Sequence, residues 1–376
     1  MASTAFIYTD RVAGFDYGSA HPMKIVRLKL TYELVRSYGL LELTGSRLIE
    51  TEAASVDDVL TVHDHRYVDV LQAVNNGQMT RDAHDYGLGP GDNPIFQGLW
   101  DWSLLSAGGS LMGARLLYEG EVDIAFSIAG GLHHAMPERA SGFCYLNDAA
   151  IAIRWLMEQG WRVAYIDIDA HHGDGVQNIF YDTSRVLTAS IHQSGRYFFP
   201  QTGFEDEIGE GQGVGYCVNI PCLPHSTDAV FVGAFKEGIV PLVRAFRPDI
   251  VVAQLGVDTF HSDPLAQIDC TTNGFCEMVH EIMGLAPKLL ALGGGGYDLV
   301  NVARAWTLAW AMFNDADPPD SLPEDFVALL GRMGLEGSKL RDAPFRGRPD
   351  MVTKAKTEAD RIITHHKQKL FPFWRS

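Results

Sequence analysis

The chain has 376 residues, of which 46% are hydrophobic, and a formal net charge of −17 at pH 7. Its length and composition are those of a globular protein with a sizeable core. The negative charge argues against direct binding to nucleic acid or to an anionic membrane, because both need a positive protein surface; it is compatible with simple solubility or with cationic substrates.

The N-terminal segment and the cysteines bear on location. The first residues, Met-Ala-Ser-Thr-Ala-Phe-Ile-Tyr, lack the basic and apolar regions of a signal peptide, and no apolar run is long enough to span a bilayer. The five cysteines are scattered without a Cys-x-x-Cys pair, so neither a disulfide framework nor a thiolate zinc site is indicated. We therefore expect a cytoplasmic protein with no membrane partner.

Short runs of β-branched and apolar residues alternate with stretches of helical spacing. The runs predict strands at 125–128, 163–168, 186–191, 250–255 and 289–292, with a further strand-like stretch at 216–220. Helical spacing predicts helices at 149–159, 229–246 and 353–364. This alternation is typical of a parallel sheet with helices on its faces. Because no linker or repeat interrupts the chain, we expect one α/β domain over 1–376, with a C-terminal helical segment at about 320–376 packed on it.

Glycine-rich or polar segments follow five of the predicted strands. They are 130–134, 169–174, 192–194, 256–259 and 293–297. In open parallel sheets the ligand site lies outside the carboxyl ends of the strands. The five segments should therefore meet at one crevice.

The segment Tyr-Ile-Asp-Ile-Asp-Ala-His-His-Gly-Asp at 165–174 predicts a metal site. Its polar residues Asp167, Asp169 and His171 fall at alternate positions, so they project from one face of a strand. Two carboxylates and an imidazole are costly to bury without a cation, and this donor set suits a divalent ion such as zinc, with ferrous iron as an alternative.

With Asp169 and His171 as the first two ligands, Asp258 is the candidate for the third, because it lies just past an apolar run. Three protein ligands leave coordination positions open for water and substrate, as in catalytic sites. The alternative is that Asp258 caps a helix beginning near Thr259.

The adjacent histidines His133 and His134 lie in a loop preceded by two glycines. Each imidazole needs a partner that fixes its tautomer, and Asp167 and Asp174 are the carboxylates left for this task. One histidine could then deprotonate a water while the other protonates the leaving group. The alternative is that they are structural histidines with satisfied hydrogen bonds.

Tyr297 follows four glycines, but no Lys-Ser/Thr follows, so a phosphate-binding P-loop is not indicated. Its phenol could hydrogen-bond an oxyanion, or it could be a buried core tyrosine. The segment 209–215 leads into a strand-like stretch and does not open a helix, so it fails as a dinucleotide fingerprint. Phe143 and Phe199 are aromatic residues of the kind that usually belong to a core.

Taken together, these motifs resemble the zinc-dependent histone deacetylases, closest to class I, with the bacterial acetoin-utilisation deacetylases and related amidohydrolases. The resemblance runs from about 21 to about 306 and rests on five motifs in order: Gly-Leu-His-His-Ala, Ser-Gly-Phe-Cys-Tyr-Leu-Asn-Asp, Asp-Ile-Asp-Ala-His-His-Gly-Asp-Gly-Val-Gln, Tyr-Phe-Phe-Pro and Gly-Gly-Gly-Gly-Tyr. It implies an arginase-like, three-layer α/β/α fold with a mainly parallel sheet of about eight strands. It also implies hydrolysis of acetyl-lysine in proteins, and binding of hydroxamate-type inhibitors to the metal.

The resemblance assigns roles residue by residue. It makes Asp169, His171 and Asp258 the zinc ligands, His134 with Asp174 the general-base pair, His133 with Asp167 the second pair, and Tyr297 the residue that polarises the acetyl carbonyl. The lysine tunnel would be lined by Phe143, Phe199 and Gly142, with Leu265 at its mouth and Asp92 on its rim. Two sites for K⁺ or Na⁺ would be formed by Asp167, Asp169, His171, Ser190 and Ile191, and by Phe180, Thr183, Val186 and Tyr216.

Three alternatives remain open. An acetylpolyamine deacetylase would share the site, although Leu265 and the lack of an evident insertion weigh against it. An arginase-like ureohydrolase would need further carboxylates to bridge two metals, and beyond the 165–174 segment only Asp258 is available. A non-catalytic acyl-lysine binder would have lost Tyr297 or a ligand, and neither is lost.

Overall fold

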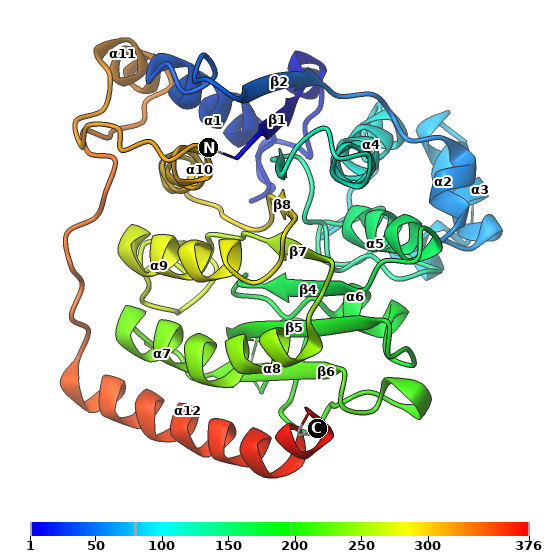
Figure 1. Ribbon diagram of the computed structural model, residues 1–376. Helices are drawn as coiled ribbons and strands as arrows, with labels where there is room; N and C mark the ends of the chain where they lie inside the picture. The colour runs from blue at the N-terminus through cyan, green and yellow to red at the C-terminus, as the bar shows by residue number, and fades with distance from the viewer. Residues whose placement is uncertain (1, 79–80, 197, 375–376) are drawn as a thin grey trace.

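The computed structural model describes residues 2–78, 81–196 and 198–374, and within them eight strands form one sheet (Figure 1). The strands are β1 (Thr4–Tyr8), β2 (Ser46–Glu50), β3 (Ile124–Ser127), β4 (Val163–Asp167), β5 (Val186–Gln193), β6 (Cys217–Cys222), β7 (Ile250–Gln254) and β8 (Leu289–Leu292). Their order is β2-β1-β3-β8-β7-β4-β5-β6, and every neighbouring pair is parallel. The predicted α/β class with a central parallel sheet is confirmed.

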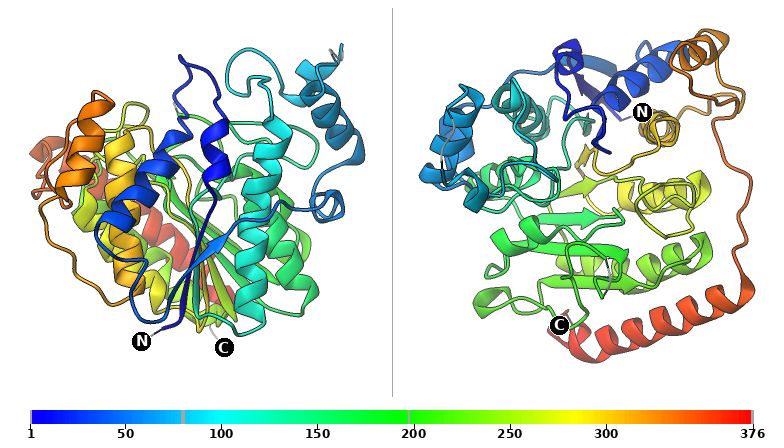
Figure 2. Two further views of the ribbon diagram at one scale, coloured as in Figure 1. Left: turned by 90° about the horizontal axis from the view of Figure 1, so that it is seen from above. Right: turned by 180° about the vertical axis from the view of Figure 1, so that it is seen from behind.

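Helices cover both faces of the sheet. They are α1 (Val26–Ser37), α2 (Val56–Leu60), α3 (His65–Asn75), α4 (Leu99–Tyr118), α5 (Asp148–Glu158), α6 (Asp174–Ile179), α7 (Asp228–Gly238), α8 (Val240–Phe246), α9 (Thr272–Met283), α10 (Leu299–Phe313), α11 (Glu324–Arg332) and α12 (Pro349–Lys369), with short 3₁₀ turns η1 (Asp10–Gly14), η2 (Ala83–Tyr86), η3 (Gly211–Gly213) and η4 (Phe371–Trp374). Helices α4 and α5 pack together on one face, whereas α1, α10, α9 and α7 form a row on the other (Figure 2). The three layers predicted for the fold are therefore present.

The central strands are buried on both faces. Every residue of β3, β4, β7 and β8 is buried, which explains why these strands read as continuous apolar runs without alternation. Helix α10 adds two fully buried tryptophans, and each indole finds a backbone acceptor: Trp306 donates to the carbonyl of Leu255 (2.8 Å) and Trp310 to that of Leu40 (3.1 Å). Burial therefore adds apolar area without leaving a donor unpaired.

The predicted strands at 125–128, 163–168, 186–191, 250–255 and 289–292 are confirmed as β3, β4, β5, β7 and β8. One predicted helix is wrong: the stretch 229–246 forms two helices, α7 and α8, that break at Ile239. Pro241 lies in the first turn of α8, where its missing N–H and its ring are tolerated, whereas inside a continuous helix both would disrupt the preceding turn.

The C-terminal segment crosses the molecule before it forms α12, which lies along β6 and α7 at the edge of the sheet (Figure 1). This helix is longer than the predicted 353–364. The chain end is held by Trp374, whose indole donates to the carbonyl of Gly215 (3.1 Å) and packs against Tyr216. No helix among the described residues is long and apolar enough to cross a membrane.

Candidate active site

Four neighbouring strands in the middle of the sheet are parallel, so their carboxyl ends lie side by side; they are β3, β8, β7 and β4. The loops that follow them carry the paired histidines, Tyr297, Asp258 and the Asp169–His171 segment, so these predicted site residues converge as expected. The segment after the predicted strand 186–191 behaves differently. Strand β5 continues to Gln193 and therefore includes His192. Both ring nitrogens of His192 have hydrogen-bond partners, the Ser190 hydroxyl (2.8 Å) and the Gly203 carbonyl (2.9 Å), so this ring offers no further metal ligand.

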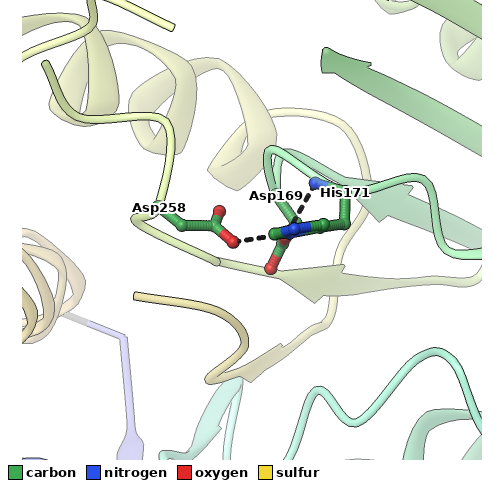
Figure 3. A group of neighbouring side chains, drawn as sticks. All are labelled: Asp169, His171 and Asp258. Carbon is green, nitrogen blue, oxygen red and sulfur yellow. Dashed lines mark hydrogen bonds and ion pairs between the residues drawn. The ribbon is translucent and has the colours of Figure 1, made fainter. Parts of the chain in front are cut away.

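Asp169, His171 and Asp258 form a compact buried group (Figure 3). One donor atom from each lies within 4.8 Å of the others. The His171 Nδ1 atom is 2.8 Å from Oδ2 of Asp258 and 3.2 Å from Oδ1 of Asp169. No helix begins at Thr259, since α9 starts only at Thr272, so the capping alternative for Asp258 is wrong.

The electrostatics of this group fit a bound cation. Burial and the neighbouring Asp169 raise the pKa of the Asp258 carboxyl to about 7. Burial opposes protonation of His171, but hydrogen bonds to Asp169 and Asp258 raise its pKa to about 10. The two carboxylates thus place negative charge in a buried site, and a divalent cation would offset it. Two carboxylates and one imidazole are a donor set for such a cation and would leave coordination positions open.

Further hydrogen bonds orient the carboxylates. Oδ2 of Asp169 accepts from the Gln254 side chain and from the Gly295 backbone N–H, both at 2.7 Å. Oδ1 of Asp258 accepts from the Ala170 N–H at 2.7 Å. Gln254 was missed in the sequence, although a polar residue that ends an apolar strand was the available signal. Such outer contacts fix the direction in which a ligand presents its lone pairs.

The two histidines have the carboxylate partners that the sequence predicted. His133 Nδ1 lies 2.8 Å from Oδ2 of Asp167, His134 Nδ1 lies 2.7 Å from Oδ1 of Asp174, and the two Nε2 atoms are 3.0 Å apart. Burial opposes protonation of His133, but the charges of Asp167 and Asp169 raise its pKa to about 9. Burial and then the charge of His133 lower the pKa of His134 to about 4. The pKa values of the two adjacent imidazoles are thus shifted in opposite directions, which suits one to act as an acid and the other as a base.

Aromatic rings lie beside the paired histidines and Tyr297. The Phe143 ring lies 5.8 Å from the Tyr297 ring, and the Phe199 ring lies 5.0 Å from His134, both nearly perpendicular. Gly142 has a φ of +50°, and a Cβ there would lie 2.4 Å from His134 and 2.9 Å from Phe199, so only glycine permits this approach. Tyr197, which opens the Tyr-Phe-Phe-Pro motif, lies outside the described residues.

The Tyr297 ring is near both Phe143 and the candidate metal ligands, with its centre 6.4 Å from that of the His171 ring. Burial and the charge of Asp258 raise the pKa of its phenol well above the ordinary value, so the hydroxyl keeps its proton. The Tyr297 backbone N–H donates to Oδ2 of Asp263 (2.8 Å), which anchors the loop that carries the phenol. A protonated phenol at this place could donate a hydrogen bond.

The predicted rim residues lie at the surface. Leu265 is 37% exposed and Asp92 is exposed, and Phe199, which was predicted for the tunnel wall, is 39% exposed. The His21 ring packs 4.6 Å from Phe143 and its Nε2–H donates to the Asp92 carbonyl (3.1 Å). His21 therefore links the rim to the aromatic wall, a role that the sequence did not predict.

The two predicted monovalent-cation groups stay predictions. Asp167 pairs with Ser190 across β4 and β5, with Ile191 next along the strand. Around the second group, the Phe180 carbonyl accepts from the Thr183 N–H (3.4 Å), and the Tyr216 carbonyl from the Thr188 N–H (3.0 Å) near Val186, which begins β5. A carbonyl oxygen has a second lone pair, so these contacts are compatible with cation binding.

Arg27 is a further buried charge close to the site. Its guanidinium donates to the Gly296 carbonyl (2.9 Å) and lies 5.3 Å from the Trp306 ring. It places a positive charge behind the Gly-rich loop that carries Tyr297. Its burial is a long-range property that residue spacing could not reveal.

Comparison with known proteins identifies relatives of this chain. Residues 21–313 match the model of the histone deacetylase domain. The chain is 41% identical over 325 residues to histone deacetylase B of Dictyostelium discoideum (86% of this chain, 76% of that protein), and 35% identical over 337 residues to the acetoin utilization protein AcuC of Bacillus subtilis (87% and 86%). Solved structures of an HDAC homolog from Aquifex aeolicus and of an HDAC homolog complexed with SAHA each superpose with a TM-score of 0.84 at 32% identity, covering 94% and 95% of this chain and all of theirs.

The chain belongs to the histone deacetylase family. It is therefore a deacetylase, and catalysis in this family depends on a metal, for which Asp169, His171 and Asp258 are the group at hand.

Proposed function

We propose that the protein hydrolyses the acetyl amide of acetyl-lysine in proteins or peptides, releasing acetate and lysine. The observation that supports this most is the buried Asp169–His171–Asp258 group beside two adjacent imidazoles, each held by its own carboxylate, with the Phe143 and Phe199 rings close by. Metal-dependent amide hydrolysis uses a cation, a base, an acid and a donor to the oxyanion, and this site has a candidate for each.

Asp169, His171 and Asp258 would hold the cation, which we propose is Zn²⁺, with Fe²⁺ as the alternative. When bound, such an ion polarises the acetyl carbonyl and makes the attacking water more acidic. The neutral Nε2 of His134 accepts the proton of that water as its oxygen bonds to the carbonyl carbon. Asp174 holds Nδ1 of the same ring and stabilises the imidazolium that forms.

Two further groups complete the reaction. The Tyr297 hydroxyl donates a hydrogen bond to the acetyl oxygen while negative charge develops there. When the carbon–nitrogen bond breaks, the lysine nitrogen takes a proton from Nε2 of His134 or of His133, whose rings adjoin.

Phe143 and Phe199 would flank the lysine stem. Flat apolar walls favour a neutral acetylated side chain over the free ammonium, so the product leaves more readily than the substrate. Leu265 and Asp92 at the rim would contact the peptide on either side of the acetyl-lysine.

The test is hydrolysis by the purified chain, loaded in turn with Zn²⁺ and Fe²⁺, of acetyl-lysine peptides beside acetylated spermidine. We expect turnover of the peptides, with inhibition by a hydroxamate such as SAHA. Turnover of the polyamine alone would replace this proposal by the acetylpolyamine alternative. Two divalent metal ions per chain in the active protein would instead favour the ureohydrolase alternative.

A further inference from the structure

The loop that carries both imidazoles has no regular secondary structure of its own. The residues from Gly130 to Ala135 in this loop are buried, and buried backbone N–H and C=O groups need hydrogen-bond partners. Five of the hydrogen bonds to this loop come from two consecutive residues at the start of α5, Asn147 and Asp148, and from His63 in the turn between α2 and α3.

Asp148 holds the loop on the side that precedes the histidines. Its buried carboxylate accepts from the N–H groups of Gly131 (2.9 Å) and Leu132 (2.7 Å) and from the Ser110 hydroxyl (2.6 Å). The two backbone donors are consecutive, so the carboxylate fixes the direction of the chain as it enters His133. Charge-assisted bonds of this kind are stronger than those between neutral groups.

Asn147 holds the other side. Its Nδ2 donates to the carbonyls of His133 (3.3 Å) and Ala135 (3.0 Å), so its two bonds bracket His134. Its Oδ1 caps α5 by accepting from the Ala150 N–H (3.0 Å), which ties the side chain to a rigid helix.

His63 extends this support. Its Nε2 accepts from the Asn147 backbone N–H (3.0 Å), so Nε2 carries no proton and the proton is on Nδ1, which donates to the Met136 carbonyl (3.1 Å). The buried ring thus joins α5 to the far end of the same loop.

We propose that Asn147 and Asp148, supported by His63, are positioning residues for the two catalytic imidazoles, and this inference rests on the proposed function. They anchor the backbone immediately before and after His133 and His134 to the first turn of α5. A displacement of about 1 Å in a reacting group can cost roughly 100-fold in rate, which is why such anchoring matters.

The experiment compares two near-isosteric variants with matched controls. Asp148→Asn places an amide N–H₂ or a weaker acceptor against two N–H donors, and Asn147→Asp places carboxylate oxygens against two carbonyls while keeping the cap of α5. Asp228→Asn is the control for the first, because Asp228 also accepts a backbone N–H (2.8 Å) and a hydroxyl (2.6 Å) from Thr271, outside the site. Asn314→Asp is the control for the second, because Asn314 donates to the Trp310 carbonyl (2.8 Å) at the end of α10.

We expect kcat on an acetyl-lysine peptide to fall by roughly 10- to 100-fold in both loop variants, with KM and metal content within about twofold of wild type. The controls should keep kcat even where the melting temperature drops. Loop variants whose kcat follows that of their controls would overturn the inference, since their role would then be stability alone.

A second measurement keeps this test separate from the proposed function. Nitrogen-15 spectra of the histidine rings report the environment of His133 and His134 whether or not the chain turns over. Ring signals that shift in Asn147→Asp but not in Asn314→Asp support positioning, and unchanged signals contradict it. An inactive wild type would contradict the proposed function alone.

Discussion

Charged side chains are buried in one region of the molecule and exposed in another. The first region is the set of loops at the carboxyl ends of β3, β8, β7 and β4, and the second is the C-terminal helix α12. At the sheet, Asp167, Asp169 and Asp258 are wholly buried against imidazoles and backbone N–H groups. On α12 the ion pair of Lys356 and Asp360 is more than half exposed. Burying a charge is costly unless it is paired, whereas an exposed pair changes stability little. The buried charges of the first region are therefore costly to the fold, and the proposed reaction gives a reason for them.

Apolar contacts hold α12 to the rest of the molecule. Helix α12 is held by its buried face, which includes Ala355, Ala359, Ile362, Ile363 and His366 and packs on α7 and β6. We therefore expect polar substitutions at the sheet to lower activity more than stability, and apolar substitutions on α12 to lower stability more than activity.

The largest expected effect is that of His134→Ala. Loss of the proton acceptor should lower kcat by about 1,000-fold, because general base catalysis contributes roughly 100- to 10,000-fold. His280→Ala, an exposed histidine on α9, is the matched control and should behave as wild type. Steady-state kinetics with metal analysis checks this; activity within tenfold of wild type would refute the base assignment.

Tyr297→Phe should come next. It removes only the hydroxyl, so the aromatic contacts remain while one donor to the oxyanion is lost, and kcat should fall by roughly 100- to 1,000-fold. Tyr118→Phe, at a 40% exposed position, is the control. Normal turnover by the Tyr297 variant, with full metal content, would remove the phenol from the mechanism.

The same contrast explains what the sequence could reveal. The residues at the sheet were predictable because each directly follows an apolar strand, so spacing alone places Asp169, His171 and Asp258 at one edge of the sheet. Two of their supports, Asn147 and Arg27, were not predictable because they act through contacts between segments far apart in the chain, whereas Gln254 had a local signal as the polar residue that ends β7. Spacing within one segment carries no information about such contacts.

Some elements were missed for local reasons. Strand β2, Ser-Arg-Leu-Ile-Glu, is polar at both ends and so lacks an apolar run, whereas β1, Thr-Ala-Phe-Ile-Tyr, has the apolar and aromatic composition of a strand and was a signal that was missed. The break between α7 and α8 had a visible signal in Pro241, which the apolar periodicity on both sides outweighed. The length of α12 depends on its docking against β6, which propensity does not encode.

On α12, Ile362→Ala should lower the free energy of unfolding by about 3 kcal/mol, because the side chain is fully buried and its removal leaves a cavity. Chemical denaturation measures this, and kcat should stay unchanged. Val327→Ala on α11, at a 40% exposed position, is the control for loss of apolar volume. A fall in kcat that matches the loss of stability would show that the two regions are not independent.

His366 should make the docking of α12 sensitive to acid. Burial, and then the neighbouring His365, lower its pKa to about 4, below the ordinary value near 6.5. The unfolded chain therefore binds the proton first, so the stabilising contribution is complete above pH 6.5 and is lost as the pH falls toward 4. Urea midpoints at pH 7 and pH 5 should differ less in His366→Leu than in wild type; equal differences would contradict this.

The smallest effect is expected for the pair of Lys356 and Asp360. The groups are 3.1 Å apart and four residues apart on α12, but their side chains are 67% and 56% exposed. The lysine also precedes the acid, the weaker orientation relative to the helix dipole. A double-mutant cycle should give a coupling of about 0.3 kcal/mol that declines with added salt. A salt-independent coupling above about 1 kcal/mol would mean that α12 holds its charges as firmly as the sheet does, and the contrast would fail.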